Sequence, residues 1–489
     1  MRILISHFHL QTGGVTRVIE HACAALAAAG HRVLVVAGEP PQKPLPEGVD
    51  FALIPALAYE ERRPRIGPAD LAAELARTAR QGLGDLPDLW HIHNHCLGKN
   101  LALPEALCTL ARQGQRLLLQ PHDFAEDGRP SLYARLLSEP GGGDATRLSA
   151  LLYPQASHLH YAVLNGRDRG FLAATGIPHD RLHLLPNAVD LPPSVDRSAD
   201  PFPGRRLWLY PTRAIRRKNL GELLLWATLA GEEDLFATTQ APRNPAEQPR
   251  YRHWVALARE LGLGLELALG ERVRDFPALL ASAYALVTTS VAEGFGLAFL
   301  ESWLAGRPLV GRNLPEITRD LVTAGLDLET LYERLEVPLD WLDRDRLRGA
   351  MDQALEAVVT AYGRARRPDD LEHLWASAVR DGYVDFGRLD EAAQEGVIRH
   401  LASDPQDRVF LRPVFLRPTH LPDTTPADRI AHNRTLAERD YSIAGYGRRL
   451  ERIYGALVEA TVDPTLGAAD GSVLLDRFLA PERLFLLRT

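Results

Sequence analysis

Lysine and cysteine are both scarce in this chain of 489 residues. The three cysteines, Cys23, Cys96 and Cys108, form an odd and sparse set without Cys-x-x-Cys spacing. Such a set fits a reducing compartment and argues against both a disulfide scaffold and a structural zinc site. Lysine occurs three times among 56 basic residues, and one of the three, Lys218, lies in a short basic turn. Because an ammonium and a guanidinium bind phosphate differently, this rare lysine makes that turn a candidate anion site.

The chain also lacks an excess of positive charge and long apolar runs. Its net charge is −7, so no overall basic field is present to hold nucleic acid, and we expect at most peripheral contact with a membrane. The longest apolar stretches fall well short of the ~20 residues that a membrane-spanning helix needs. The first residues, MRILISHFHL, show no charged segment followed by an apolar one, so we expect no signal peptide and a cytoplasmic location.

The first half of the sequence alternates short apolar runs with helical patterns. Residues 2–8 and 31–38 are typical of buried strands, and residues 15–30 between them are typical of a helix that ends at Gly30. Near-continuous apolar strands separated by helices indicate a parallel sheet that is covered on both faces. Further strand ends are expected near residues 88–95, 116–123, 159–165 and 181–187.

A proline-rich stretch divides the chain. Six prolines between Leu185 and Thr212 interrupt any regular element, which predicts a domain boundary there. The sequence therefore predicts an α/β protein with two Rossmann-like, doubly wound domains in tandem, at residues 1–195 and 205–435. The strands of the second domain are expected at residues 206–212, 235–240, 265–270, 283–290 and 307–311.

The C-terminal part departs from this alternation. From about residue 320 to 407 the pattern is helical, as in LDLETLYERLEV and LRGAMDQALEAVVTAYGRA, and this is more chain than a second Rossmann-like domain needs. The repeat VFLRPVFLRP at residues 409–418 favours an extended connection, because proline disfavours a helical residue before it. Residues 432–460 form an amphipathic helical pattern. We expect the helical segment 320–407 to belong to the second domain, and residues 440–489 to pack back on the first.

The stretch SVAEGFGLAFLESWLAG, residues 290–306, places one carboxylate before a Gly-Phe-Gly turn and another inside the helix that follows. Glycines between a strand and a helix let the backbone approach a ligand closely, and free N–H groups at about Phe295 to Leu297 favour an anion. Glu301 would lie roughly 6–9 Å from the helix start, about the distance from a diphosphate to the ribose that it esterifies. Glu293 would lie on the other side of the phosphate, near the hydroxyls of a sugar. A capping glutamate and a solvated helical one are the alternative.

Two cations lie just beyond an expected strand end in PTRAIRRKN, residues 211–219. Arg213 and Lys218 could clamp a diphosphate and stabilise the charge that develops as a nucleotide leaves. A solvated basic turn is the alternative.

These two motifs resemble those of the retaining glycosyltransferases of family 4, which have the GT-B fold. The pattern Glu293-Gly-Phe-Gly…Glu301 is similar to the E-x7-E signature of that family, and Arg213…Lys218 is similar to its diphosphate-binding pair. The resemblance implies that the two Rossmann-like domains face each other across a cleft, that Glu293 contacts the donor sugar, and that Glu301 contacts the ribose. It covers roughly residues 1–40 and 115–320, and the helical segment 320–407 has no counterpart in it.

Further positions follow from the same resemblance. Gly13 and Gly14 lie in a loop that would meet the donor phosphates and the acceptor. His122, at the end of a strand, would contact the transferred sugar or the acceptor. Asn187, in the turn PNAVD, would lie in the cleft, and Arg272 would contact the nucleobase.

Histidines recur at every second position, at His91, His93 and His95. This period puts three imidazoles on one face of a strand, a geometry that can bind zinc. No Glu-x-x-His motif or nearby carboxylate completes such a site, so we expect no bound metal. We expect His9, His93, Asn94 and His95 to contact the acceptor instead.

The function predicted from the sequence is transfer of a hexose from a nucleotide diphosphate sugar, UDP-glucose or GDP-mannose, to a hydroxyl of a small soluble acceptor, with retention of configuration. The cationic pair takes the place of the divalent metal that other transferases use, so we expect neither a cofactor nor a metal. A phosphorylase or nucleotide-sugar epimerase of the same fold is one alternative, and a metal-dependent hydrolase that uses the three strand histidines is another. The predicted catalytic residues are His122, Arg213, Lys218 and Glu293; the predicted donor-binding residues are Gly13, Gly14, Arg213, Lys218, Arg272, Glu293, Gly294, Phe295, Gly296, Leu297 and Glu301; the predicted acceptor-binding residues are His9, His93, Asn94, His95 and Asn187.

Overall fold

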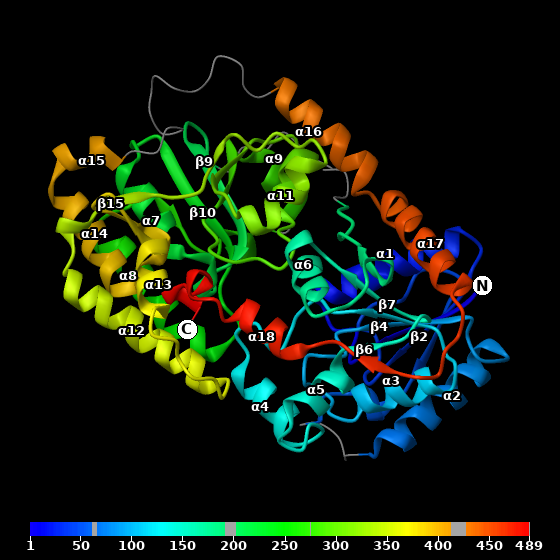
Figure 1. The fold of residues 1–489 in the computed structure, drawn as a ribbon. Coiled ribbons are helices and arrows are strands. Elements are labelled where there is room, and N and C mark those ends of the chain that lie inside the picture. Colours follow the sequence, from blue (N-terminus) through cyan, green and yellow to red (C-terminus); the bar gives the residue numbers. More distant parts are fainter. Residues whose placement is uncertain (61–65, 191–201, 274, 412–426, 489) are drawn as a thin grey trace. The chain divides into compact units, whose positions relative to one another are not determined.

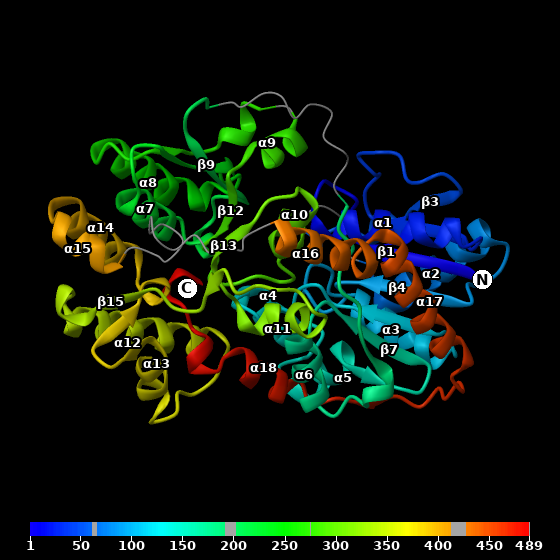
Figure 2. The same cartoon turned by 90° about the horizontal axis from the view of Figure 1, so that it is seen from above.

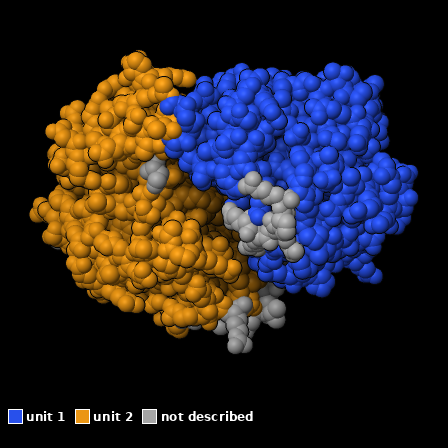
Figure 3. Space-filling view, turned by 90° about the horizontal axis from the view of Figure 1, so that it is seen from below, with its two compact units in different colours: residues 1–188, 361–364, 440–480 blue, residues 189–360, 365–439, 481–489 orange. Residues whose placement is uncertain are grey.

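The computed structural model describes residues 1–60, 66–190, 202–273, 275–411 and 427–488 (Figure 1). The chain divides into two compact units, each built around its own parallel sheet (Figure 2). The change from unit 1 to unit 2 after residue 188 falls within the proline-rich stretch, of which residues 191–201 lie outside the described part. Unit 1 comprises Met1–Ala188, Ala361–Arg364 and Asp440–Ala480, and unit 2 comprises Val189–Thr360, Ala365–Arg439 and Pro481–Thr489 (Figure 3).

The sheet of unit 1 has seven parallel strands in the order β3-β2-β1-β4-β5-β7-β8. Its central strands are buried along almost their whole length, as the apolar runs predicted. The strand order reverses between β1 and β4, and in such sheets ligands bind beyond the carboxyl ends of the strands at this reversal. The strands are β1 (Arg2–His7), β2 (Arg32–Ala37), β3 (Val49–Leu53), β4 (Leu89–His93), β5 (Leu117–Gln120), β7 (Leu159–Val163) and β8 (Leu182–Leu184).

One face of this sheet is covered by two helices that are far apart in the sequence, α1 and α17, which lie side by side (Figures 1 and 2). On α17, Tyr446, Leu450 and Leu457 form an apolar stripe that joins Ile19 of α1 and Ile5 of β1 in one buried core. The helices of unit 1 are α1 (Gly14–Ala28), α2 (Pro68–Leu83), α3 (Leu103–Arg112), α4 (Pro130–Ser138), α5 (Ala145–Leu152), α6 (Gly166–Ala174), α17 (Ile443–Glu459) and α18 (Gly471–Phe478), and β18 (Gly467–Ala468) pairs with β6 (Pro154–Gln155).

The chain end departs from the expectation that residues 440–489 pack on the first domain. Residues 440–480 belong to unit 1, but residues 481–489 belong to unit 2. The guanidinium of Arg388 donates to the carbonyls of Leu484 at 2.8 Å and Glu482 at 2.7 Å, and Arg483 pairs with Glu316. These contacts hold the last turn on unit 2.

The sheet of unit 2 repeats the topology of the first, with six parallel strands in the order β11-β10-β9-β12-β13-β14. Its strand order reverses between β9 and β12. The strands are β9 (Arg206–Arg213), β10 (Asp234–Gln240), β11 (Leu265–Glu266), β12 (Ala285–Thr288), β13 (Leu309–Arg312) and β14 (Leu331–Tyr332); the helices are α7 (Leu220–Leu229), α8 (Gln248–Glu260), α9 (Phe276–Ser282), α10 (Ala298–Leu304), α11 (Pro315–Thr323) and α16 (Ala427–Asp440).

The segment predicted as helical over residues 320–407 is only partly so. A three-stranded antiparallel sheet in the order β15-β17-β16 interrupts it, and residues 326–337, predicted as helix, contain β14 and the start of β15. Asp381 and Gly382 both have positive φ, at 49° and 79°, the geometry of a tight hairpin turn between strands. The elements of the segment are β15 (Glu336–Pro338), α12 (Arg344–Ala361), α13 (Asp370–Ala378), β16 (Val379–Arg380), β17 (Tyr383–Asp385), α14 (Glu391–Ser403) and α15 (Pro405–Leu411).

The connection predicted to be extended at residues 409–418 begins inside α15, which reaches Leu411, and residues 412–418 lie outside the described part. Among the described helices, none is both long enough and apolar enough to cross a membrane.

Candidate active site

The loops that follow β9 and β12 are fastened to each other at the strand reversal of unit 2. A short 3-10 turn, Arg216–Lys218, follows β9, and Asn219 then adopts a left-handed φ of 52° before α7 begins. From the other loop, the hydroxyl of Thr289 donates to the carbonyls of Lys218 at 2.9 Å and Asn219 at 3.1 Å, and the N–H of Val291 donates to the carbonyl of Arg217 at 3.0 Å. The backbone at Lys218 is therefore held by the loop that follows the neighbouring strand β12.

Lys218 and Glu293 meet in a compact charged cluster between these loops. The ammonium of Lys218 contacts Glu293 Oε1, Arg217 Nη1 lies 3.0 Å from Glu293 Oε2, and the hydroxyl of Ser290 donates to Glu293 Oε1 at 2.7 Å. Burial raises the pKa of Glu293, but Lys218 and Arg217 outweigh it and lower the pKa to about 2. The carboxylate is therefore ionised at neutral pH and can accept hydrogen bonds from hydroxyl groups.

The structure pairs Glu293 with a cation that the motif did not single out. Arg213 ends β9 with an exposed side chain, which donates to Gln240 Oε1 at 3.3 Å at the end of the neighbouring strand, whereas Arg217 reaches Glu293. The sequence contains both arginines in the same basic run, and the direction of the 3-10 turn decides which one faces Glu293. Ser290 was also missed, although it ends the predicted strand three residues before Glu293.

The predicted turn at residues 294–296 precedes α10, which begins at Ala298, one residue later than the expected helix start at Leu297. Gly296 has a φ of 79°, and a Cβ added there would lie 2.5 Å from the ring of Phe299. This position therefore requires glycine for both conformational and steric reasons. By contrast, a Cβ on Gly294 would meet nothing within 4 Å.

The two remaining predicted donor contacts of unit 2, Arg272 and Glu301, lie on different elements. Glu301 lies in the first turns of α10 and is 9% exposed. Arg272 follows the 3-10 turn Leu269–Glu271, where it is exposed and pairs with the exposed Glu266. Glu301 is thus held inside a helix, while Arg272 lies on the surface.

At the strand reversal of unit 1, the structure brings His122 together with His93. Their rings stack with centroids 5.1 Å apart, and His93 Nδ1 and His122 Nε2 share a hydrogen bond of 2.8 Å. Asn94, with a φ of 57°, accepts from the N–H groups of His122 at 2.7 Å and Asp123 at 3.1 Å. Asn94 was predicted to contact the acceptor, and its amide oxygen fixes the loop that carries His122.

The three alternating histidines do not form a single face. His91 stacks on His93 with centroids 4.3 Å apart and bonds to Tyr454 and Gln120, both at 2.8 Å. His95 lies beyond the end of β4, where its Nε2 bonds to the carbonyl of Leu152 at 2.8 Å inside the unit. Within the described ranges, no three histidine, cysteine or acidic side chains are placed to hold a metal ion. The geometry gives the hydrolase alternative no support.

The buried imidazoles of His91, His95 and His122 are uncharged at neutral pH. Burial lowers the pKa of His91 to about 3 and the pKa values of His95 and His122 to about 4. Neutral imidazoles both donate and accept hydrogen bonds, so the cluster suits hydroxyl groups better than anions.

Several polar atoms in unit 1 are buried without a hydrogen-bond partner among the described residues. They include His93 Nε2 and Asn187 Oδ1, both predicted to contact the acceptor, and His7 Nδ1, which was not. His7 ends β1 next to His93, with ring centroids 6.3 Å apart. Buried polar groups nearly always have a partner, so these three atoms leave hydrogen-bonding capacity unused within the described residues.

The remaining predicted residues of unit 1 follow β1. His9 is half-buried and its Nε2 bonds to the hydroxyl of Tyr59 at 3.1 Å. Gly13 precedes α1, which begins at Gly14. The nearest atom to a Cβ added at Gly13 would be 3.8 Å away, and one at Gly14 would meet nothing within 4 Å. The surrounding protein therefore does not itself require glycine at either position.

Comparisons with known proteins agree with this fold. Residues 12–192 match the model of the family described as Glycosyltransferase Family 4. Mannosylglucosyl-3-phosphoglycerate synthase from Petrotoga mobilis is 28% identical over 346 residues, which are 64% of this chain and 65% of that protein. The match thus spans just under two thirds of that relative's length.

Two solved structures share the architecture over nearly their whole length. Sucrose-phosphate synthase from Thermosynechococcus elongatus has a TM-score of 0.52 at 14% identity, over 93% of this chain and 98% of that one. HepE from Anabaena, in complex with UDP and glucose, has a TM-score of 0.51 at 13% identity, over 93% and 99% of the two chains. The predicted class is confirmed: two Rossmann-like units define a GT-B fold. The chain is thus similar to the glycosyltransferases of family 4, which is the family that the motifs at Glu293, Glu301 and Lys218 resemble.

Proposed function

We propose that the protein transfers a hexose from a nucleotide diphosphate sugar to a hydroxyl of a small soluble acceptor, with retention of configuration and without a catalytic metal. The observation that carries this proposal is the cluster of Lys218, Arg217 and Glu293 at the strand reversal of unit 2. It combines cations for a diphosphate with a carboxylate for the sugar at the edge where open α/β sheets bind ligands.

On the donor side, a diphosphate would compete with Glu293 for Lys218 and Arg217. Its charge exceeds that of a single carboxylate, so it would draw the two cations toward itself. Glu293 would then be free to accept hydrogen bonds from the hydroxyls of the sugar. Arg213, exposed at the end of β9, would add a further cation, and Glu301 would accept from the ribose.

On the acceptor side, the neutral imidazoles of unit 1 would recognise hydroxyl groups. His122 would contact the sugar or the acceptor, with its orientation set by His93 and Asn94. The unpartnered atoms at His7, His93 and Asn187 would bond to hydroxyls of the bound molecule. Gly13 and Gly14 would leave room for a ligand that side chains would obstruct.

In the reaction, the bond from the anomeric carbon to the phosphate oxygen would break, and a bond to the acceptor oxygen would form on the same face. The departing phosphate would take the proton of the acceptor hydroxyl. Lys218 and the arginines would stabilise the negative charge that grows on the phosphate. No enzyme group needs to form a covalent intermediate in this scheme.

The relatives support particular substrates. One relative is named mannosylglucosyl-3-phosphoglycerate synthase, and a protein of similar fold was solved with UDP and glucose. We therefore propose UDP-glucose or GDP-mannose as the donor and a small soluble glycoside as the acceptor. We further propose a cytoplasmic setting, with which three unpaired, buried cysteines are in keeping.

The proposal is tested first by nucleotide binding. Calorimetry with UDP, GDP and ADP on the wild-type protein and on Lys218→Ala should show one preferred nucleotide, with its affinity reduced at least about tenfold by the substitution, which removes a charge-assisted contact. Lys43→Ala, in the β2–β3 connection of unit 1, is the matched control and should leave binding unchanged. If Lys218→Ala binds every nucleotide as the wild type does, unit 2 does not hold the donor as proposed.

A further inference from the structure

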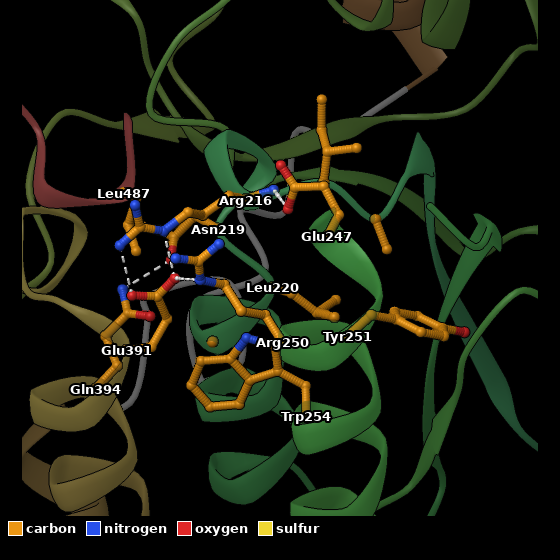
Figure 4. A pocket seen from close by; sticks show the side chains of 13 residues that line it. Arg216, Asn219, Leu220, Glu247, Arg250, Tyr251, Trp254, Glu391, Gln394 and Leu487 are labelled. Carbon is orange, nitrogen blue, oxygen red and sulfur yellow. Dashed lines mark hydrogen bonds and ion pairs between the residues drawn. The ribbon is translucent and has the colours of Figure 1, made fainter. Parts of the chain in front are cut away.

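The segment at residues 336–411, from β15 to α15, contacts the loop that carries Lys218. At the start of α14, the carboxylate of Glu391 accepts two hydrogen bonds from the guanidinium of Arg216, with Nη2 to Oε2 at 2.9 Å (Figure 4). Arg216 is the first residue of the 3-10 turn that ends at Lys218. Glu391 thus holds the beginning of this turn from a helix about 175 residues further along the chain.

One turn along the same helix, Gln394 holds the residue that follows Lys218. Its side-chain amide donates to Asn219 Oδ1 at 2.8 Å and to the carbonyl of Phe386 at 3.1 Å, and both Gln394 and Asn219 are almost completely buried. Asn219 in turn donates to Glu222 Oε2 at 2.7 Å. These bonds stabilise Asn219 in its left-handed conformation, which turns the chain from Lys218 into α7.

The start of α14 is itself anchored within unit 2. Asp390 caps the helix by accepting from the N–H of Ala393 at 2.9 Å, and it receives two further bonds from Arg346 of α12, at 2.9 and 2.8 Å. Gln394 also packs so closely on α7 that a Cβ at Gly221 would lie 2.3 Å from its Oε1. The support of the loop is therefore continuous from α12 through α14.

We propose that α14 is a positioning element for the diphosphate-binding loop, in which Glu391 and Gln394 fix Arg216 and Asn219 and so direct Arg217 and Lys218 toward Glu293. The proposal rests on the proposed function, since it assigns the loop to the donor diphosphate. Neither Glu391 nor Gln394 would touch the donor. An ordered loop spares part of the entropy that would otherwise be lost on binding, and it keeps the ammonium aligned with the leaving phosphate.

The test compares Glu391→Gln with Glu395→Gln on the same helix. Glu395 bonds to His253 at 2.7 Å and Arg399 at 2.8 Å, so its substitution removes a comparable charged contact that does not involve the loop. Hydrogen exchange of residues 214–220 reports the order of the loop directly, and steady-state kinetics report the KM for the donor. We expect Glu391→Gln to speed exchange in this peptide and to raise the donor KM at least fivefold. Where the ammonium of Lys218 also loses its alignment, the donor KM should rise about tenfold. We expect neither change in Glu395→Gln.

Unchanged exchange of residues 214–220 in Glu391→Gln would overturn the inference, and so would faster exchange with an unchanged donor KM. A Glu395→Gln variant that behaves like Glu391→Gln would also overturn it, because the effect would then be a general loss of stability. If the wild-type protein turns over no nucleotide sugar, the proposed function fails, and the exchange data still decide whether α14 orders the loop. Gln394→Leu provides a second variant at the other end of the turn, with the same expected outcome.

Discussion

Glu293 is held between Lys218 and Arg217, which gives this single carboxylate two opposing effects on ligand binding. It competes with a diphosphate for both cations, and it offers an acceptor for the hydroxyls of the sugar. We therefore predict that Glu293→Gln binds the free nucleoside diphosphate more tightly than the wild type, by up to about tenfold, while sugar transfer falls at least about 100-fold.

Calorimetry with the free nucleotide and a transfer assay on the same preparation measure the two effects separately. Glu301→Gln is the matched control, because loss of a ribose acceptor should weaken nucleotide binding. Weaker nucleotide binding in Glu293→Gln would contradict the competition between Glu293 and the diphosphate.

Glu126 predicts a pH dependence of stability within unit 1. Its Oε1 accepts from the hydroxyl of Tyr153 at 2.9 Å, its Oε2 is buried without a partner among the described residues, and burial raises its pKa to about 7. Because the folded-state pKa lies above the unfolded value, the folded state binds the proton more tightly. The contribution to stability is complete below about pH 4.5 and is lost as the pH rises to about 7, a change of order 3 kcal/mol.

Glu126→Gln mimics the protonated form at every pH, so it should remove this loss. Denaturant unfolding at pH 5 and pH 8, monitored by hydrogen exchange of unit 1 peptides, measures the difference in stability between wild type and variant. An equal difference at both pH values would contradict the assignment.

Single residues of the site could be predicted only where a motif names them. Lys218, Glu293 and Glu301 follow from the spacing of charged residues around a strand, a turn and a helix. Arg217 and Ser290 could not be separated from their neighbours, because spacing along a loop does not reveal which way a 3-10 turn directs each side chain. The contacts of Asn219 with Gln394 depend on packing between residues 175 positions apart, for which the sequence holds no local signal.

At the scale of elements, long buried strands were predicted well and short ones poorly. The apolar runs at residues 2–8 and 206–212 closely match β1 (Arg2–His7) and β9 (Arg206–Arg213), because a parallel strand covered on both faces must be apolar throughout. Strands of two or three residues, such as β15 (Glu336–Pro338) and β16 (Val379–Arg380), are too short to show a period. The predicted helical segment 320–407 therefore concealed a small sheet.

The turn between β12 and α10 predicts different costs for two glycines only two residues apart. Gly296→Ala would force a side chain into a positive φ and against the ring of Phe299, whereas Gly294→Ala would meet nothing within 4 Å. We expect the first to lower the free energy of unfolding of unit 2 by about 1–3 kcal/mol and the second to change it by less than about 0.5 kcal/mol. Denaturant titration of both variants measures this difference, and equal stabilities would show that the turn does not constrain Gly296.

At the scale of the whole molecule, the chain contributes to each unit from several separate stretches. Unit 1 contains residues 440–480 as well as the N-terminal part, and the last residues, from Pro481 on, belong to unit 2. Sequence patterns could not predict this exchange, because the amphipathic faces of α17 and of the last turn show that they must be buried but not against which sheet. The sheet against which each face packs is decided by the fit of the surfaces and by specific contacts, such as those of Arg388 with the last turn.

Assignment of the last turn to unit 2 leads to a prediction about Leu486. This side chain is 4% exposed and belongs to the hydrophobic core of unit 2. Leu486→Ala should create a cavity that destabilises unit 2 by about 2–5 kcal/mol, while Leu53→Ala, at a position 46% exposed on β3 of unit 1, should change little. Because a chain with two units need not unfold in one step, hydrogen exchange resolved by peptide is the appropriate measurement. Faster exchange is expected in strands β9 and β12 and not in β1 and β4; the reverse pattern would mean that the chain end stabilises unit 1 instead.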